Sequence, residues 1–275
     1  MHVAIATSQG TPEEPNEDFA AATADGIVLL DGAGLAGTTT KCVHGVAWYA
    51  RHLGGALLAG LADDDRDLTA ILAQAIAETA ALHAGTCDLD DPGTPSSTVV
   101  AARIRHDRLE YLVLADSVLV LDTAQGPPVV VTDDRGNRIG ARYRQEMDRT
   151  RNGTPEHTEA RRRYVQALRA YRNRPGGFWV AAADPTAATQ AITGACPLNE
   201  VERAVLLSDG AQRIVHPFGL ATWPEVLDTL DRHGPDELVR QVRRAESSDP
   251  DGRRWPRAKA HDDATVVYCT GFRRP

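Results

Sequence analysis

The chain has 275 residues, of which 42% are hydrophobic and 25% are charged, a balance typical of a folded globular protein with a sizeable core. Its net charge of −8 argues against a nucleic-acid partner, which would require a basic surface. Because the N-terminus lacks the basic and apolar regions of a signal peptide and no apolar run approaches the roughly 20 residues that span a bilayer, we expect a cytoplasmic protein without a membrane partner.

Eight short runs that are rich in Val, Leu or Ile and bounded by Gly, Asp or Pro predict β-strands. In chain order they are Gly26–Leu30, Ser97–Ile104, Leu109–Leu114, Val118–Asp122, Val129–Thr132, Phe178–Ala182, Ala204–Leu207 and Thr265–Thr270. The third and fourth runs flank Ala115-Asp116-Ser117, which predicts a hairpin.

Five segments predict helices, with apolar residues at helical spacing or with clear start and stop signals. They are Thr38–Gly54, Leu68–Ala84, Glu156–Asn173, Trp223–His233 and Asp236–Glu246. Strands and helices do not alternate strictly along the chain, which disfavours a doubly wound parallel sheet. We therefore expect an α+β protein in which two antiparallel sheets are covered by helices.

The segment from about residue 133 to 175 differs from the rest because it is polar and rich in arginine. Its one predicted helix places Tyr164, Leu168 and Tyr171 on a common face. A unit of this size would be too small to hold a core of its own. We interpret it as an insertion or flap on a single domain that comprises residues 1–275.

The four cysteines, Cys42, Cys87, Cys196 and Cys269, are far apart and form no C-x-x-C pair. This spacing predicts neither a disulfide framework nor a zinc cluster. Scattered buried thiols are typical of a protein from a reducing compartment.

Acidic residues recur where the predicted strands end or begin. Leu30 is followed by Asp31-Gly32, Ala115 by Asp116, and Ser208 by Asp209-Gly210, while Asp262-Asp263 opens the last strand and Asn16-Glu17-Asp18 precedes another apolar stretch. A single Asp-Gly is usually only a turn, but carboxylates at several strand ends can converge on one point. Such a cluster is tolerable only around cations. Oxygen ligands without His or Cys favour Mg²⁺ or Mn²⁺ over Zn²⁺.

This ordered set resembles the motifs of the protein phosphatase 2C (PPM) family, and the resemblance covers nearly the whole chain. The matching segments, in family order, are Asn16-Glu17-Asp18, Asp31-Gly32-Ala33-Gly34, Ser96-Ser97-Thr98-Val99, Ala115-Asp116-Ser117, Ser208-Asp209-Gly210 and Asp262-Asp263-Ala264-Thr265. Each motif is weak by itself. Six of them in the family's order make a strong signal.

The resemblance implies a four-layer αββα sandwich with a centre of two Mg²⁺ or Mn²⁺ ions. In that family pattern Asp31 would bridge the two ions and the Gly32 carbonyl would bind one of them. Asp209 and Asp262 would complete the first site, and Glu17 and Asp18 would serve the second. Asp116 resembles the family's acid for a looser third ion.

The implied activity is hydrolysis of phosphomonoesters, by default phosphoserine and phosphothreonine in proteins. Two cations that share a water lower its pKa, so that a bridging hydroxide can attack phosphorus in line. The sequence offers no Asp-x-Asp-x-Thr nucleophile and no Cys-x5-Arg loop for a phosphoenzyme route. A phosphorylated protein or a small phosphoester is thus the expected partner.

Three positions depart from the family pattern. Glu13 stands where the family usually has an arginine that binds phosphate, and a carboxylate there would repel it. Ala33 replaces a histidine that many bacterial relatives also lack, and Arg213 replaces an acid that some relatives use for a third metal. Other arginines are weak candidates for the phosphate contact, namely Arg142, Arg144, Arg161–Arg163 and Arg213. His44 and His261 are interpreted as packing or surface residues rather than as catalysts.

Two alternatives remain beside the protein phosphatase. The missing arginine and the insertion favour a phosphatase for a small metabolite, which a panel of phosphorylated metabolites would reveal. Glu13 also permits a catalytically weak regulatory or binding module of the same fold. The retained acids oppose that second alternative, because a scaffold without ions has little use for them.

Overall fold

Two five-stranded antiparallel sheets form the centre of the molecule, for which the computed structural model describes residues 1–34, 40–91 and 93–272. The first sheet has the order β1 (His2–Ser8), β12 (Ala264–Thr270), β11 (Val201–Leu207), β8 (Val118–Thr123) and β9 (Val129–Val131). The second has the order β10 (Ile192–Pro197), β7 (Arg108–Leu114), β6 (Val99–Arg105), β3 (Gly26–Leu30) and β2 (Phe19–Ala22). A small ribbon pairs β4 (Gly32–Ala33) with β5 (Ser96–Ser97).

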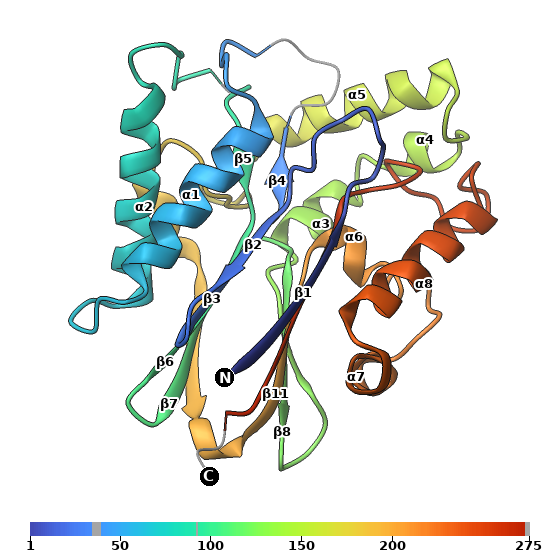
Figure 1. Cartoon of the computed structure of the whole chain (residues 1–275). Coiled ribbons are helices and arrows are strands. Elements are labelled where there is room, and N and C mark those ends of the chain that lie inside the picture. Colours follow the sequence, from blue (N-terminus) through green and yellow to red (C-terminus); the bar gives the residue numbers. More distant parts are fainter. Residues whose placement is uncertain (35–39, 92, 273–275) are drawn as a thin grey trace.

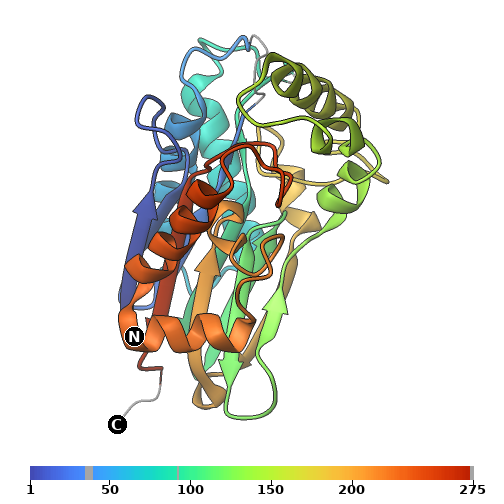
Figure 2. The ribbon, with the colours of Figure 1, turned by 90° about the vertical axis from the view of Figure 1, so that its right-hand side faces the viewer.

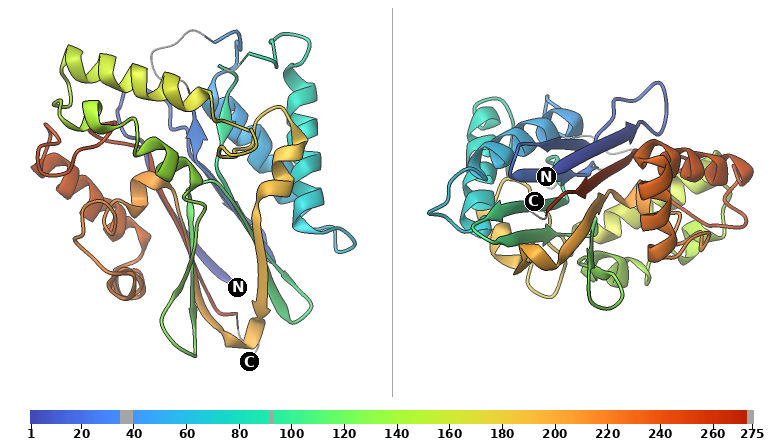
Figure 3. Two further views of the ribbon diagram at one scale, coloured as in Figure 1. Left: turned by 180° about the vertical axis from the view of Figure 1, so that it is seen from behind. Right: turned by 60° about the horizontal axis from the view of Figure 1, so that its bottom comes forward.

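Two pairs of helices cover the outer faces of the sheets (Figures 1 and 3). The helices α1 (Val46–Gly60) and α2 (Leu68–His83) pack on the second sheet. The first sheet is covered by α7 (Trp223–His233) and α8 (Pro235–Ser248). The chain therefore has the expected α+β, four-layer αββα architecture.

The alternation of side chains along each strand explains the layers. In β3, Ile27 and Leu29 point between the sheets, whereas Val28 and Leu30 pack against α1 and α2. β11 does the same in the other sheet, with Leu206 pointing inward and Leu207 toward α7 and α8. Both faces of these strands are buried, which is why they read as continuous apolar runs in the sequence.

Three helices lie across the end of the sandwich opposite the N-terminus (Figures 1 and 2). They are α3 (Arg135–Gly140), α4 (Gln145–Asp148) and α5 (Pro155–Arg169), and all belong to the arginine-rich segment. The short α6 (Asp209–Gln212) follows β11 at the same end, and two 3-10 helices, Pro185–Gln190 and Leu198–Glu200, complete the elements. None of the helices in the described residues has the length and apolar character that crossing a bilayer demands.

The predicted hairpin around Asp116 is wrong. β7 belongs to the second sheet and β8 to the first, so the connection between them crosses from one sheet to the other. Ala115 makes this crossing with a left-handed backbone, φ 68°. Because both runs are buried on two faces, each pairs with central strands of its own sheet instead of with its neighbour in the chain.

Other differences from the sequence analysis concern weak apolar patterns. Phe178–Ala182 is not a strand and makes only isolated bridges, one from Phe178 to Arg172 and one from Ala181 to Ser97. The helix expected from Thr38 begins only at Val46 and continues to Gly60. Its first two expected residues, 38 and 39, lie outside the described part. Besides the two-residue β4, the strands that the sequence did not predict are β1, β2 and β10, which are edges of the two large sheets, where less burial leaves a weaker pattern.

Candidate metal centre

The sheet register brings the acidic motifs to one end of the sandwich. Phe19 pairs with Leu30, so Asp18 and Asp31 stand side by side just beyond that pair. Leu207 pairs with both Val118 and Val266, which brings the segments of Asp209, Asp116 and Asp262 together in the first sheet. Antiparallel pairing thus gathers residues that are up to 244 positions apart.

The carboxylates of Asp18, Asp31 and Asp209 form the inner part of this cluster. The backbone N–H of Asp209 donates to Asp31 Oδ2 over 3.0 Å. Asp18 is buried, and the hydroxyl groups of Thr265 and Ser208 act to lower the pKa of its carboxyl. Within the described part of the chain its Oδ2 atom has no hydrogen-bond partner. A buried oxygen without a partner is costly and calls for an unseen ligand such as a cation.

The pKa values of these three carboxyls lie above their ordinary range. Burial raises the pKa of Asp18 to about 8, with a further contribution from the negative charge of Asp209. Burial likewise raises the pKa of Asp31 and of Asp209, and each feels the charges of its acidic neighbours. The three groups therefore repel one another as anions, and a divalent cation would relieve this repulsion.

Asp262 differs because two cations of the chain neutralise it. Lys259 Nζ lies 2.6 Å from Asp262 Oδ1, and Arg213 Nη2 lies 2.7 Å from Oδ2. Burial alone would raise the pKa of Asp262, but the charges of Lys259 and Arg213 outweigh it and lower the pKa. The same attraction raises the pKa of Lys259 despite its burial.

Arg213 is held on both sides. Its Nη1 donates to Glu246 Oε1 over 2.6 Å, and its Nη2 donates to Asp262 Oδ2 over 2.7 Å. Arg213 and Glu246 are both buried, and Arg243 also donates to Glu246. The guanidinium of Arg213 therefore serves as an internal counter-ion that joins α8 to the acidic cluster.

Glu17 and Gly32 approach each other closely. A Cβ at Gly32 would lie 2.6 Å from the Glu17 carbonyl oxygen and 2.5 Å from a methyl of Val46, so only glycine fits. Asp263, to which the sequence analysis gave no role of its own, accepts from the backbone N–H of Gly10 and of Glu17 at 2.8 and 2.7 Å. It thereby fixes the loop that carries Glu17, whose pKa is raised by burial.

Asp116 lies at the margin of the cluster, under the arginine-rich segment. Asn137 of α3 donates to its Oδ2 over 3.2 Å. Burial and the charge of Asp209 raise the pKa of Asp116 to about 6. A small cavity of about 140 Å³ separates this residue from Tyr164 of α5.

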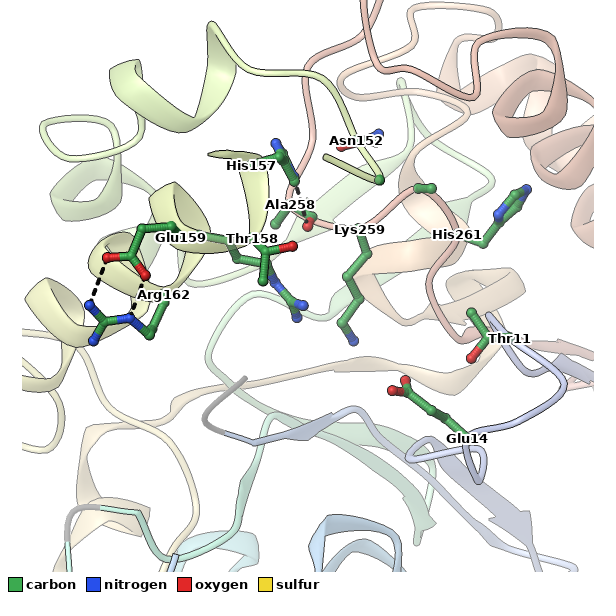
Figure 4. Close-up of a pocket in the computed structure, with 13 residues that line it drawn as sticks. Thr11, Glu14, Asn152, His157, Thr158, Glu159, Arg162, Ala258, Lys259 and His261 are labelled. Atoms are coloured by element: carbon green, nitrogen blue, oxygen red, sulfur yellow. Dashed lines mark hydrogen bonds and ion pairs between the residues drawn. The ribbon is translucent and has the colours of Figure 1, made fainter. Parts of the chain in front are cut away.

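A pocket of about 590 Å³ opens beside the cluster (Figure 4). Three segments line it: the loop with Thr11 and Glu14, the helix α5 with residues 152–153 before it, and the loop of residues 258–261 before β12. Lys259 points into the pocket, and Glu14 faces it from the opposite wall (Figure 4). The sequence analysis did not propose Lys259 as a site residue. The one sequence signal that could have identified it is its position close before Asp262.

Arg161 contributes a second positive charge to this pocket. Burial lowers the pKa of Arg161, while Asp262 and Glu14 oppose the shift. In the described part of the chain no hydrogen bond or ion pair joins its guanidinium to another residue. It can therefore bind an anion without breaking an existing pair.

The remaining candidate arginines lie elsewhere or are paired. Arg142 is exposed and lines a separate pocket with Arg135 and Trp179. Arg144 pairs with Asp148 at 2.9 Å. Arg162 pairs with Glu159 and Arg163 with Glu146, at 2.7 and 2.5 Å.

The residues at the strand ends fit divalent cations. The donors are carboxylate oxygens and the backbone of Gly32, and one oxygen, Asp18 Oδ2, is buried without a partner. Such a donor set suits the hard ions Mg²⁺ and Mn²⁺. Asp262 would have to exchange part of its pairing with Lys259 for an ion.

Comparison with known proteins agrees with this geometry. A family model described as Protein phosphatase 2C matches residues 7–244. No curated protein matched the chain.

Solved structures share the fold. The serine/threonine phosphatase PstP/Ppp of Mycobacterium tuberculosis aligns with 17% identity and a TM-score of 0.56, covering 97% of each chain. The PPM Ser-Thr phosphatase MsPP of Mycobacterium smegmatis, in complex with cacodylate, gives 19% identity and a TM-score of 0.56, with 98% of this chain and 97% of that one covered. A catalytic domain of PstP in complex with two manganese ions gives 19% identity and a TM-score of 0.55, with 97% and 96% covered.

Proposed function

Since this chain belongs to the protein phosphatase 2C family of metal-dependent serine/threonine phosphatases, we propose that it hydrolyses phosphoserine and phosphothreonine in proteins with two bound Mg²⁺ or Mn²⁺ ions. The observation that carries the proposal is the cluster of Asp18, Asp31 and Asp209, whose carboxyl pKa values are all raised. Among the described residues, Asp18 Oδ2 is buried and has no hydrogen-bond partner.

The ligand set we propose is Asp18, Asp31, Gly32, Asp209 and Asp262, with Glu17 at the second ion and Asp116 at a third. When bound, the ions activate water for attack on phosphorus and offset charge on the phosphoryl oxygens. Asp263 keeps Glu17 in place through two backbone hydrogen bonds. The register of β2 against β3 fixes Asp18 beside Asp31, so the carboxylates are oriented before an ion arrives.

We assign the substrate phosphate to Lys259 and Arg161. Both line the pocket beside the cluster, and Lys259 is within ion-pair distance of Asp262. Their charges make up for the acid at position 13, where the family has arginine. Arg161 comes from α5 of the inserted segment, so this proposal gives the segment a role in binding substrate.

The test is manganese-dependent release of phosphate from p-nitrophenyl phosphate and from a phosphothreonine peptide. Asp31→Asn and Asp209→Asn should each lower kcat/KM by about 10³-fold or more, because a ligand to the ions is lost. Asp228→Asn is the matched control, since Asp228 is exposed on α7. Hydrolysis that survives both substitutions in folded protein would exclude these residues from the mechanism.

A small phosphorylated metabolite is the second candidate substrate, because the pocket of about 590 Å³ lies in the range that encloses small ligands. Comparing kcat/KM for a panel of phosphorylated metabolites with that for phosphopeptides separates the two. A preference for one metabolite by about 100-fold or more would replace the protein substrate.

A further inference from the structure

A second cluster of metal-binding side chains lies outside the acidic centre. Cys42 and His44 come from the segment just before α1, whereas His83 is the last residue of α2 and Cys87 lies in the loop that follows. One ligand atom from each of the four lies within 4.8 Å of all the others. The sequence spacing had predicted scattered thiols, but the packing of α1 against α2 brings these two pairs together.

The distances within the cluster match the edges of a tetrahedron around one ion. The two sulfurs are 3.5 Å apart, and the Sγ–Nδ1 distances are 3.3 Å (Cys87–His44), 3.7 Å (Cys42–His83) and 4.0 Å (Cys42–His44). Zinc bonds of about 2.3 Å to sulfur and about 2.0–2.1 Å to nitrogen give tetrahedral edges of about 3.8 Å for S–S and about 3.6 Å for S–N. A disulfide would need the sulfurs at about 2.05 Å.

Few polar groups surround the cluster, and the Thr86 hydroxyl, 3.6 Å from Cys87 Sγ, is one of them. Cys42 and His83 are buried, and among the described residues His83 Nε2 has no hydrogen-bond partner. The ring of Trp48 stacks on His44 at 4.2 Å and lies 5.2 Å from His83. A buried imidazole whose polar contacts are only thiols is poorly satisfied, and such a group indicates an ion that completes it.

The chemistry of the four donors selects the ion. Two thiolates and two imidazoles form the Cys₂His₂ set that holds structural zinc, with no open position for a substrate. Soft sulfur ligands disfavour Mg²⁺ and Mn²⁺. Binding requires both thiols to lose a proton to solvent, and Zn²⁺ with two thiolates is then neutral, which suits a partly buried position.

We propose that Cys42, His44, His83 and Cys87 bind one structural Zn²⁺ ion. The ion clamps the entry to α1 onto the end of α2. An exposed ion pair between Lys41 and Asp88, at 2.7 Å, joins the same two segments at the surface.

The clamp is linked to the acidic centre through Val46, the first residue of α1. A Cβ on Gly32 would meet Val46 at 2.5 Å, so the start of α1 packs directly on the proposed metal-binding backbone. Zinc at the Cys/His cluster therefore positions one wall of the catalytic centre without touching substrate.

The experiment measures zinc in the full-length protein, purified under reducing conditions and passed through EDTA, by elemental analysis. We expect one zinc ion per chain, and after replacement by Co²⁺ we expect visible ligand-field bands of tetrahedral strength with sulfur charge transfer. The double variant Cys42→Ser/Cys87→Ser should lose the zinc and melt on the order of 10 °C lower. Cys196→Ser, a half-buried cysteine on β10, is the matched control and should keep the zinc.

Two further variants keep the test decisive. If the double variant does not fold, His44→Ala, which alters a half-buried ligand, should weaken zinc binding and change the cobalt spectrum. Asp31→Asn should lose activity but keep its zinc, which separates this site from the acidic centre. Zinc-free wild-type protein after reconstitution, an unchanged zinc content in the double variant, or a Cys42–Cys87 disulfide found by mass spectrometry would overturn the proposal.

Discussion

The acidic centre and the Cys/His cluster lie near each other but are built on opposite plans. The acidic centre would take oxygen ligands from strand ends of both sheets, and a pocket that Lys259 lines opens beside it. The Cys/His cluster takes sulfur and nitrogen from two segments that flank a helix pair, under the ring of Trp48. The first plan leaves room for substrate, and the second closes around its ion.

The two regions also differ in how they balance charge. The acidic centre contains its own cations, Lys259 and Arg213, which neutralise Asp262. No charged side chain of the described residues pairs with the ligand atoms of the Cys/His cluster. A bound cation would therefore be the main group that neutralises the charge of its thiolates. An ion in the acidic centre would thus compete with an internal cation and exchange readily, whereas zinc in the other cluster would replace only protons.

Chelation should produce the largest difference between the two regions. EDTA should abolish phosphatase activity, because the oxygen site exchanges its ions, and Mn²⁺ should restore it. Zinc content should stay unchanged over the same treatment, since two thiolates hold zinc tightly, whereas Tm should fall because the acidic centre has lost its ions. Activity assays, elemental analysis and calorimetry on one sample make the comparison. Simultaneous loss of zinc and activity would mean that the two regions release their metal ions equally readily.

Arg213→Met tests whether the internal cation is structural. Removing Arg213 leaves the buried carboxylates of Asp262 and Glu246 with one cation each, Lys259 and Arg243, so the free energy of unfolding should fall by about 3 kcal/mol in urea titrations. Arg232→Met, which breaks an exposed pair with Asp228, should cost less than about 1 kcal/mol. If the Arg213 variant is fully stable but has a raised KM, Arg213 binds phosphate instead.

Lys259→Gln tests whether the Lys259 ammonium and a metal ion compete for Asp262. Without the ammonium beside Asp262, Mn²⁺ should bind about tenfold more tightly by calorimetry, because one like charge is gone. KM for the phosphopeptide should rise about tenfold, because the phosphate loses a contact. Lys41→Gln changes the chain's only other lysine and should alter neither value. A weaker affinity for Mn²⁺ would contradict the competition.

The pH dependence of the metal-free protein gives the most gradual effect. Asp18 has a folded pKa of about 8 against 3.8 unfolded, so the unfolded state loses its proton first. Stability is then greatest below about pH 4 from this group and falls as pH rises toward about 8. Urea titrations should show this decline, and Asp18→Asn or saturating Mn²⁺ should flatten it. A rise in stability over the same interval would mean that Asp18 is ionised in the folded protein.

Much of the acidic centre was predictable because strand ends are marked in sequence. Buried runs such as Gly26–Leu30 are continuous and apolar, and an acid directly after one, as at Asp31, is conspicuous. Edge strands such as β1 and β2 were not predicted, since half-buried edges carry mixed residues. The hairpin predicted around Asp116 was wrong. No local feature of the sequence indicates whether two consecutive buried strands pair with each other or belong to different sheets.

The sequence by itself determined the layers of the fold and the identity of the acids, because both are written in local patterns of apolar runs and the residues that end them. Only the tertiary structure decided which charges meet. Lys259 and Arg213 pair with Asp262, and Cys42-x-His44 meets His83-x₃-Cys87, through packing between segments that are distant in the chain. Contacts of that kind depend on the positions of whole helices and sheets, which no short motif records.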